Sequence, residues 1–142
     1  MLKKLAATAL LATLAATAQA RDDRLQFPVA EALATPSAQA KIDPQIKLVF
    51  GKTPAGAKAL GTYTSNKKTN FFNKSDKDGC EWVFLSAVLA LQERAKQEGG
   101  NAVVNIVSVY RNNELSSETE YQCGAGSVMG GVALRGTVVK LP

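Results

Sequence analysis

One segment of the chain, an apolar helix followed by a valine-rich strand, constrains the fold more than any other. Residues 82–91 are almost entirely apolar, and residues 92–98 are mostly polar. Gly99-Gly100 then ends the pattern, as glycine commonly does at a helix C-terminus. Residues 102–110 place apolar side chains on both faces, as a central strand requires. This order predicts a long helix packed against a sheet.

The other strands are predicted from alternation and from turn residues. The expected strands cover residues 46–50, 59–64, 118–123 and 132–141, and a turn at 111–114 is expected to join two strands in a hairpin. Asp78 is expected to cap the long helix, and residues 124–131 to form a flexible glycine-rich stretch. The predicted fold class is therefore α+β, with one long helix on an antiparallel sheet of about four or five strands.

The first twenty residues predict export. Residues 1–4 are a short basic start, residues 5–17 are apolar, and Ala18-Gln19-Ala20 is a small-x-small cleavage site. This order is typical of a secretory signal peptide, and the apolar run is too short for a membrane anchor. We expect cleavage after Ala20 and a periplasmic or secreted mature protein.

The rest of the chain is expected to form one domain. Residues 1–20 are the signal peptide, 21–45 an irregular N-terminal arm, and 46–142 a single α+β domain. The arm carries three prolines, and a short helix is expected to open at Pro36. No stretch after residue 20 is apolar for 18 residues, so no transmembrane helix is predicted.

Two cysteines, Cys80 and Cys123, are the only ones in the sequence. In an oxidising compartment an even pair is interpreted first as a disulfide. Alternation along residues 118–123 turns Cys123 inward, within plausible reach of Cys80 at the start of the helix. A soft-metal site and a redox pair remain the alternatives, although a redox pair normally has two residues between its thiols.

Composition removes several classes of function. The chain has no histidine, so it lacks the most common general base and transition-metal ligand. We therefore expect no catalytic site, no resident metal and no cofactor. The net charge of +5 is too weak to predict nucleic-acid binding, but it favours an anionic envelope component or an acidic protein as partner.

The basic residues gather in a polar segment at 65–79. Its lysines surround two adjacent aromatic residues, and the candidate interaction patch is Lys67, Lys68, Phe71, Phe72, Lys74 and Lys77. Exposed aromatic rings among lysines favour a contact surface. Alternatively, both rings anchor a long loop in the core.

Two blocks resemble a known family. Residues 92–104 read as a helix end, Gly-Gly-Asn-Ala-Val-Val and a strand, and residues 132–139 end in Arg-Gly-Thr-Val-Val. Together they resemble the YbjQ/RcsF-like superfamily over about half of the chain. The resemblance implies an α+β fold. Some members are described as heavy-metal binders that assemble as rings, so it also implies thiol-based metal binding and homo-oligomerisation as possibilities.

A more specific resemblance is to small exported bacterial proteins that carry the label excinuclease ATPase subunit. The matching motifs lie at residues 66–70, 80–82, 91–95 and 116–120. The label itself finds no support, because the chain has no Walker A sequence and no zinc-binding cysteine cluster. Two hypotheses follow: a non-catalytic, envelope-associated interaction module, or a heavy-metal binder that uses Cys80 and Cys123.

Overall fold

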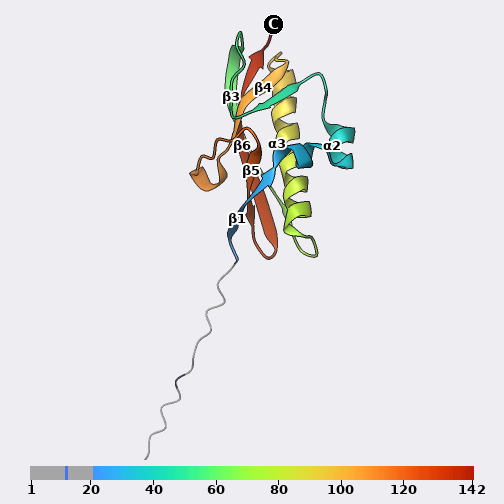
Figure 1. Cartoon of the computed structure of the whole chain (residues 1–142), viewed down its shortest axis with the longest axis vertical. Helices are drawn as coiled ribbons and strands as arrows, with labels where there is room; N and C mark the ends of the chain where they lie inside the picture. Colours follow the sequence, from blue (N-terminus) through green and yellow to red (C-terminus); the bar gives the residue numbers. More distant parts are fainter. Residues whose placement is uncertain (1–11, 13–20) are drawn as a thin grey trace, which may run out of the picture.

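The computed structural model describes residue 12 and residues 21–142, so the predicted signal peptide lies almost wholly outside the described residues. One long helix packs on one face of a sheet (Figure 1). The elements are β1 (Asp23–Pro28), α1 (Val29–Leu33), α2 (Pro36–Lys41), β2 (Lys47–Phe50), β3 (Lys58–Asn70), α3 (Asp76–Gln97), β4 (Ala102–Ser108), the 3-10 turn η1 (Tyr110–Asn112), β5 (Glu120–Ala125) and β6 (Met129–Lys140).

The sheet is larger than predicted and is mixed rather than antiparallel. Five of its six strands follow the order β1-β5-β6-β4-β2, and the sixth, β3, pairs with β6 outside this path. β6 pairs with β3 along its whole length, and its other edge pairs with β5 near its start and with β4 towards its end. β2 runs parallel to β4 because the chain passes through β3 and α3 between them. The α+β class itself is confirmed.

The predicted hairpin between residues 102–110 and 118–123 is wrong. β4 and β5 do not pair with each other, because they pair with successive parts of the same edge of β6. Ser108 at the end of β4 forms a bridge with Leu115, and its hydroxyl accepts a hydrogen bond from the Gln122 N–H of β5 at 2.9 Å. The glycine-rich stretch is ordered instead as the end of β5, a short turn and the start of β6. The chain turns at η1, but long-range pairing with β6 replaces the predicted pairing between the two strands.

The predicted irregular arm is mostly regular. β1 pairs antiparallel with β5, which places Leu25 opposite Cys123, and α1 and α2 follow directly. Val29, Ala32 and Ala38 are buried, so this segment belongs to the folded domain. The helix expected at Pro36 is confirmed, and Thr35 caps it by accepting a hydrogen bond from the Ala38 N–H at 3.2 Å.

The long helix α3 supplies most of one side of the core. Ser75, rather than Asp78, caps it by accepting a hydrogen bond from the Asp78 N–H at 3.1 Å. Phe84 stacks between Phe50 and Tyr121, with ring centroids 5.9 and 4.1 Å away. These rings join α3 to β2 and β5, and thus to both halves of the sheet.

Glycines at the β5–β6 hairpin accept aromatic rings on the sheet. A Cβ at Gly124 would lie 2.0 Å from the Tyr110 ring, and one at Gly130 would lie 2.1 Å from the Phe71 ring. Residues with side chains cannot occupy such positions while the rings stay where they are. These glycines therefore serve close packing, rather than the flexibility that the sequence had predicted.

Candidate functional site

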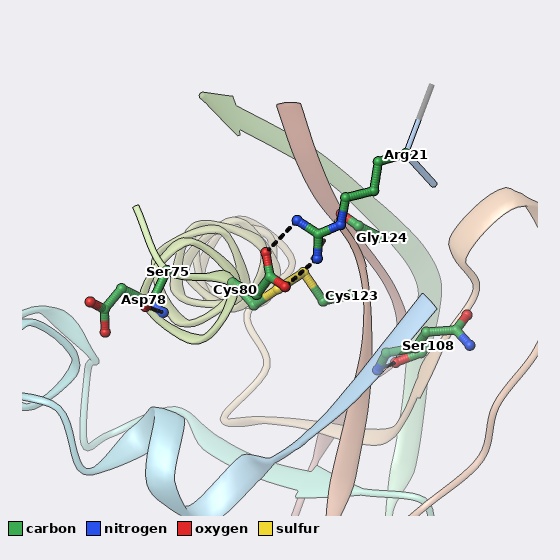
Figure 2. The surroundings of a disulfide bond; sticks show 9 residues. Arg21, Ser75, Asp78, Cys80, Ser108, Cys123 and Gly124 are labelled. Atoms are coloured by element: carbon green, nitrogen blue, oxygen red, sulfur yellow. Dashed lines mark hydrogen bonds and ion pairs between the residues drawn. A yellow bond between two sulfur atoms is a disulfide. The ribbon is translucent and has the colours of Figure 1, made fainter. Parts of the chain in front are cut away.

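The predicted disulfide between Cys80 and Cys123 is confirmed. It joins the start of α3 to β5, with an S–S distance of 2.10 Å and a Cα–Cα distance of 5.9 Å. Both cysteines are fully buried. Arg21 lies beside the bridge (Figure 2), where its guanidinium hydrogen-bonds both carboxylate oxygens of Asp76. Its hydrogen bonds to Asp76 and Asp23 raise the pKa of Arg21.

The bridge bears on the metal-binding alternative. Both sulfurs are bonded to each other, and thiolate ligation needs free sulfur. Within residues 21–142, no group of three or more cysteine or acidic side chains is placed to hold a metal ion. The disulfide thus acts as a covalent link between helix and sheet.

The predicted interaction patch is distributed over several surfaces. Lys67 and Lys68 lie on β3 rather than in a loop, because β3 extends to Asn70. Neighbouring residues on a strand point to opposite faces. Lys67 accordingly lines a groove beside α3, whereas Lys68 lines a depression with Tyr110 and Arg111 on the other face.

The remaining patch residues are also separated. Phe71 is buried in the core, while Phe72 is 66% exposed. Lys77 forms an ion pair with Glu31 at 3.2 Å, which raises the pKa of Lys77. Lys74 borders the exposed face of Trp82. The two aromatic rings therefore have different roles, one in the core and one on the surface.

β3 has a free edge. The strand spans 13 residues and pairs along one side with β6. Its other side pairs with no strand of the described chain. A strand at a sheet edge presents backbone N–H and C=O groups that can pair with another chain. This is the longest strand of the sheet, and it lies at the upper left in Figure 1.

A groove of about 360 Å³ lies between this edge and α3. Tyr63, Thr64, Ser65, Asn66 and Lys67 of β3 form one wall, and Ala90, Leu91 and Arg94 of α3 form the other. The small side chains of Ser65 and Ala90 leave the space that the groove occupies. Its volume falls within the range of about 300–1,000 Å³ that is usual for binding clefts.

Ser65 is a buried polar residue in the wall of the groove. It is only 6% exposed, and its hydroxyl has no hydrogen-bond partner among the described residues. Buried hydroxyls in folded proteins are normally hydrogen-bonded. Neighbouring protein atoms cover the Ser65 hydroxyl, so it is an unpaired polar group of the interior and does not face the groove.

The groove carries positive charge at both ends. The Arg94 guanidinium lies over the Tyr63 ring, 4.1 Å from its centroid, and its Nε lies 3.2 Å from a Glu98 carboxylate oxygen. Stacking holds the guanidinium plane in place. Lys67 forms no ion pair within residues 21–142. An anionic group between these cations would be stabilised.

A smaller depression beside Trp82 is the weaker candidate. It holds about 130 Å³ and is lined by Glu81, Asp78 and hydroxyl side chains of α2 and its cap. Burial raises the pKa of Glu81, and burial also raises the pKa of Tyr121. The Lys41 ammonium already lies over the Trp82 ring, 4.7 Å from its centroid, so one face of that ring is occupied.

The sequence did not identify the groove residues. Arg94 stood in the polar half of a predicted helix, and Ser65 began a segment interpreted as a loop. Only the pairing of β3 with β6 places these two side chains on opposite walls of one groove. A lone serine in a polar segment carries no sequence signal of this kind.

Comparison with protein-family models, curated proteins and solved structures finds no match for the chain. Among the described residues, no helix combines the length and apolar character needed to cross a membrane. The site therefore has to be interpreted from its own geometry.

Proposed function

We propose that the chain is an exported, non-catalytic binding module that takes up an extended segment of another polypeptide as an additional strand on β3. The observation that carries this proposal is the free edge of the 13-residue strand β3, next to a groove of about 360 Å³. Strand addition uses backbone hydrogen bonds for affinity and adjacent side-chain pockets for specificity. The edge of β3 and the wall of α3 supply both.

The proposed location is the periplasm or the exterior. The signal-like N-terminus supports it, and so does the disulfide between Cys80 and Cys123, since such bonds persist in oxidising compartments. Membership of the YbjQ/RcsF-like superfamily is part of the same proposal. An envelope-associated partner would then bind to β3 outside the cytoplasm.

A foreign polypeptide fits this edge better than a second copy of the chain. β3 carries Lys58, Lys67 and Lys68, and lysines on an edge strand oppose pairing between identical strands. The chain as a whole carries a net charge of +5, which also disfavours self-association. A dimer that forms through β3 would be the competing outcome.

Fluorescence anisotropy with a designed peptide tests the proposal. The probe is a labelled octapeptide in which valine alternates with glutamate, and its controls are two versions with methylated backbone nitrogens on one edge or the other. Methylation removes the N–H donors and keeps every side chain. We expect one methylated version to lose most of its affinity, because one edge of the peptide must pair with β3. Equal binding of all three peptides would show that strand addition does not occur.

A further inference from the structure

We infer that one end of the domain docks on a lipid bilayer that contains anionic headgroups. This end, named here the apolar tip, consists of the loop at residues 70–75 and the turn at 126–129 between β5 and β6, and it lies at the bottom of Figure 1. The inference follows from three observations: where the exposed apolar side chains gather, which charges lie beside them, and where the chain enters the domain.

The exposed apolar side chains gather at the tip. Within residues 21–142, the large hydrophobic residues that are exposed are Phe72, Trp82, Val128 and Met129. The Phe71 N–H donates to the Val128 carbonyl at 2.6 Å, and Met129 pairs with Asn70 at the end of the β3–β6 ladder. The loop after β3 and the turn before β6 are therefore adjacent, and together they present Phe72, Val128 and Met129.

The loop that carries Phe72 is held in place by its own contacts. The Asn70 side-chain oxygen accepts from the Phe72 N–H at 2.7 Å, and the Lys74 N–H donates to the Phe71 carbonyl at 3.0 Å. Phe71 is buried, whereas Phe72 is 66% exposed. A phenyl ring held in water loses the free energy that burial would give it. A bilayer interface would restore that free energy without rearranging the loop.

Two lysines flank the apolar residues. Lys68 lines a depression with Met129, and Lys74 borders Trp82. Neither ammonium forms an ion pair within residues 21–142. Basic side chains around an apolar surface bind anionic membranes, because the apolar groups enter the interface while the cations meet the headgroups. Their charge is therefore complementary to an anionic bilayer.

Most acidic residues near the tip are paired with arginine. The ion pairs join Asp23 and Asp76 to Arg21, and Asp22 to Arg111. Asp78 and Glu81 have no ion pair within residues 21–142, and both line the depression beside α2. The unpaired lysines thus lie next to the apolar side chains, and the unpaired carboxylates extend towards α2.

The chain enters the domain at the same end. Arg21 is the first residue of the described segment 21–142, and its guanidinium bonds Asp76 at the start of α3. The predicted apolar segment 5–17 lies outside the described residues, and residues 18–20 separate it from Arg21. Three residues bridge at most about 15 Å. A signal peptide in the bilayer would therefore hold the tip beside the membrane until cleavage, which would add the Arg21 α-ammonium there.

A bilayer fits the tip better than a second copy of the chain. A symmetric contact uses the same surface on both copies, so it would bring Lys68 and Lys74 of each copy together. Like charges at such a contact repel one another. The apolar side chains also lie on turns at one end of the molecule, a shape suited to a flat and deformable surface.

Energy transfer from Trp82, the only tryptophan, to dansyl-labelled lipid measures docking on vesicles. We expect the protein purified after export to bind vesicles of mixed phosphatidylglycerol and phosphatidylcholine. Phe72→Ser should weaken binding about tenfold, because the ring no longer enters the interface. Val128→Ser provides a second variant of the tip and should also weaken binding. Circular dichroism checks that each variant is folded.

The charge contribution has a matched control on the same strand. Lys74→Gln should weaken binding about threefold. Lys58→Gln removes the same charge at the opposite end of β3, where Lys58 pairs with Lys140, and it should leave binding unchanged. All variants share one N-terminus, so differences among them report the domain itself.

Three results would overturn the inference. The first is equal binding of the natural protein, Phe72→Ser and Val128→Ser to the mixed vesicles. The second is equal binding of the natural protein to mixed vesicles and to phosphatidylcholine alone. The third is a dimer in analytical ultracentrifugation that Phe72→Ser dissociates, because a second copy would then cover the tip. None of these results bears on strand addition at β3, which the methylated peptides test separately.

Discussion

Gln92 is a polar side chain in the interior, and it fixes the segment that leads into β2. Its amide donates to the carbonyls of Asp43 and Ile46 at 3.0 and 2.8 Å, and its carbonyl accepts from the Asp43 N–H at 3.0 Å. The residue is only 2% exposed. One side chain of α3 thus bonds three backbone groups, and of these the Asp43 carbonyl also accepts from the Ile46 N–H at 3.2 Å.

Replacing Gln92 by methionine should lower the free energy of unfolding by about 2–3 kcal/mol, because the shape is kept while the Ile46 carbonyl and the Asp43 N–H lose their partner. Urea denaturation followed by circular dichroism measures the change. Gln97→Met, an exposed site on the same helix, is the control and should change stability by less than about 0.5 kcal/mol. Equal effects at the two positions would contradict the role of Gln92.

Asp43 makes stability depend on pH. A hydrogen bond from the Gln45 N–H, together with Lys96, lowers the pKa of the Asp43 carboxyl in the folded state. The stabilisation is therefore present above the ordinary aspartate pKa of about 3.9, and it is lost as the pH falls through the lower folded value. Asp43→Asn should be less stable than the natural protein at pH 7 and should converge with it at about pH 2.

Urea midpoints at the two pH values measure this convergence. Glu93→Gln is the control, because Glu93 is an exposed and more distant partner of Lys96, at 4.0 Å. If Asp43→Asn is less stable than the natural protein by the same amount at both pH values, the charge of the Asp43 carboxylate is not the cause of the loss.

Single residues were the hardest features to predict from the sequence. The inward direction of Cys123 followed from strand alternation and is confirmed by the bridge to Cys80. Gln92 was not identified, because its role depends on partners far away in the sequence. Composition and spacing describe such residues only as polar.

At the scale of elements, the disulfide links α3 to β5. Replacing Cys80 or Cys123 with serine should lower the free energy of unfolding by roughly 2–4 kcal/mol, because the unfolded chain gains freedom. Denaturation under non-reducing conditions measures the loss. When reductant is added, the denaturation midpoint of the natural protein should approach that of the variant. An unchanged midpoint without reductant would refute a stabilising role for the bridge.

The contact between Gly124 and the Tyr110 ring couples β5 to the turn η1. Gly124→Ala should cost about 1–3 kcal/mol, because the new methyl group would lie 2.0 Å from the ring. In a Tyr110→Ala background the same change should cost much less, since the space is open. Thermal denaturation of the natural protein, the two single variants and the double variant measures these costs. Equal costs in the two backgrounds would show that the Tyr110 ring is not the obstacle.

Local patterns predicted some elements well and others poorly. The helix α3 and the strand β4 follow from periodicity within about ten residues, and both lie near their expected positions. β3 extends six residues beyond the expected strand end at 64, into a lysine- and asparagine-rich sequence with little strand propensity. Its pairing with β6 along the full length overrides that propensity, and a single local window cannot reveal it.

At the scale of the whole molecule, one strand determines the architecture. β6 pairs with three other strands, so the sheet is organised around residues near the C-terminus. β3 is placed on the outside of β6 and remains open along its other side in the described chain. The free edge is thus a consequence of topology. Residues 65–67, which the sequence placed at the start of a basic loop, form part of one wall of the groove.

Hydrogen exchange of the β3 amides, with and without the valine–glutamate octapeptide, tests the central claim most directly. β1 and β2 end the sheet path and provide internal controls on the same molecule. If the peptide adds to β3, exchange should slow at alternate amides within residues 63–67, and the amides of β1 and β2 should exchange as before. Protection confined to β1 or β2, or no protection at β3 under saturating peptide, would contradict the account.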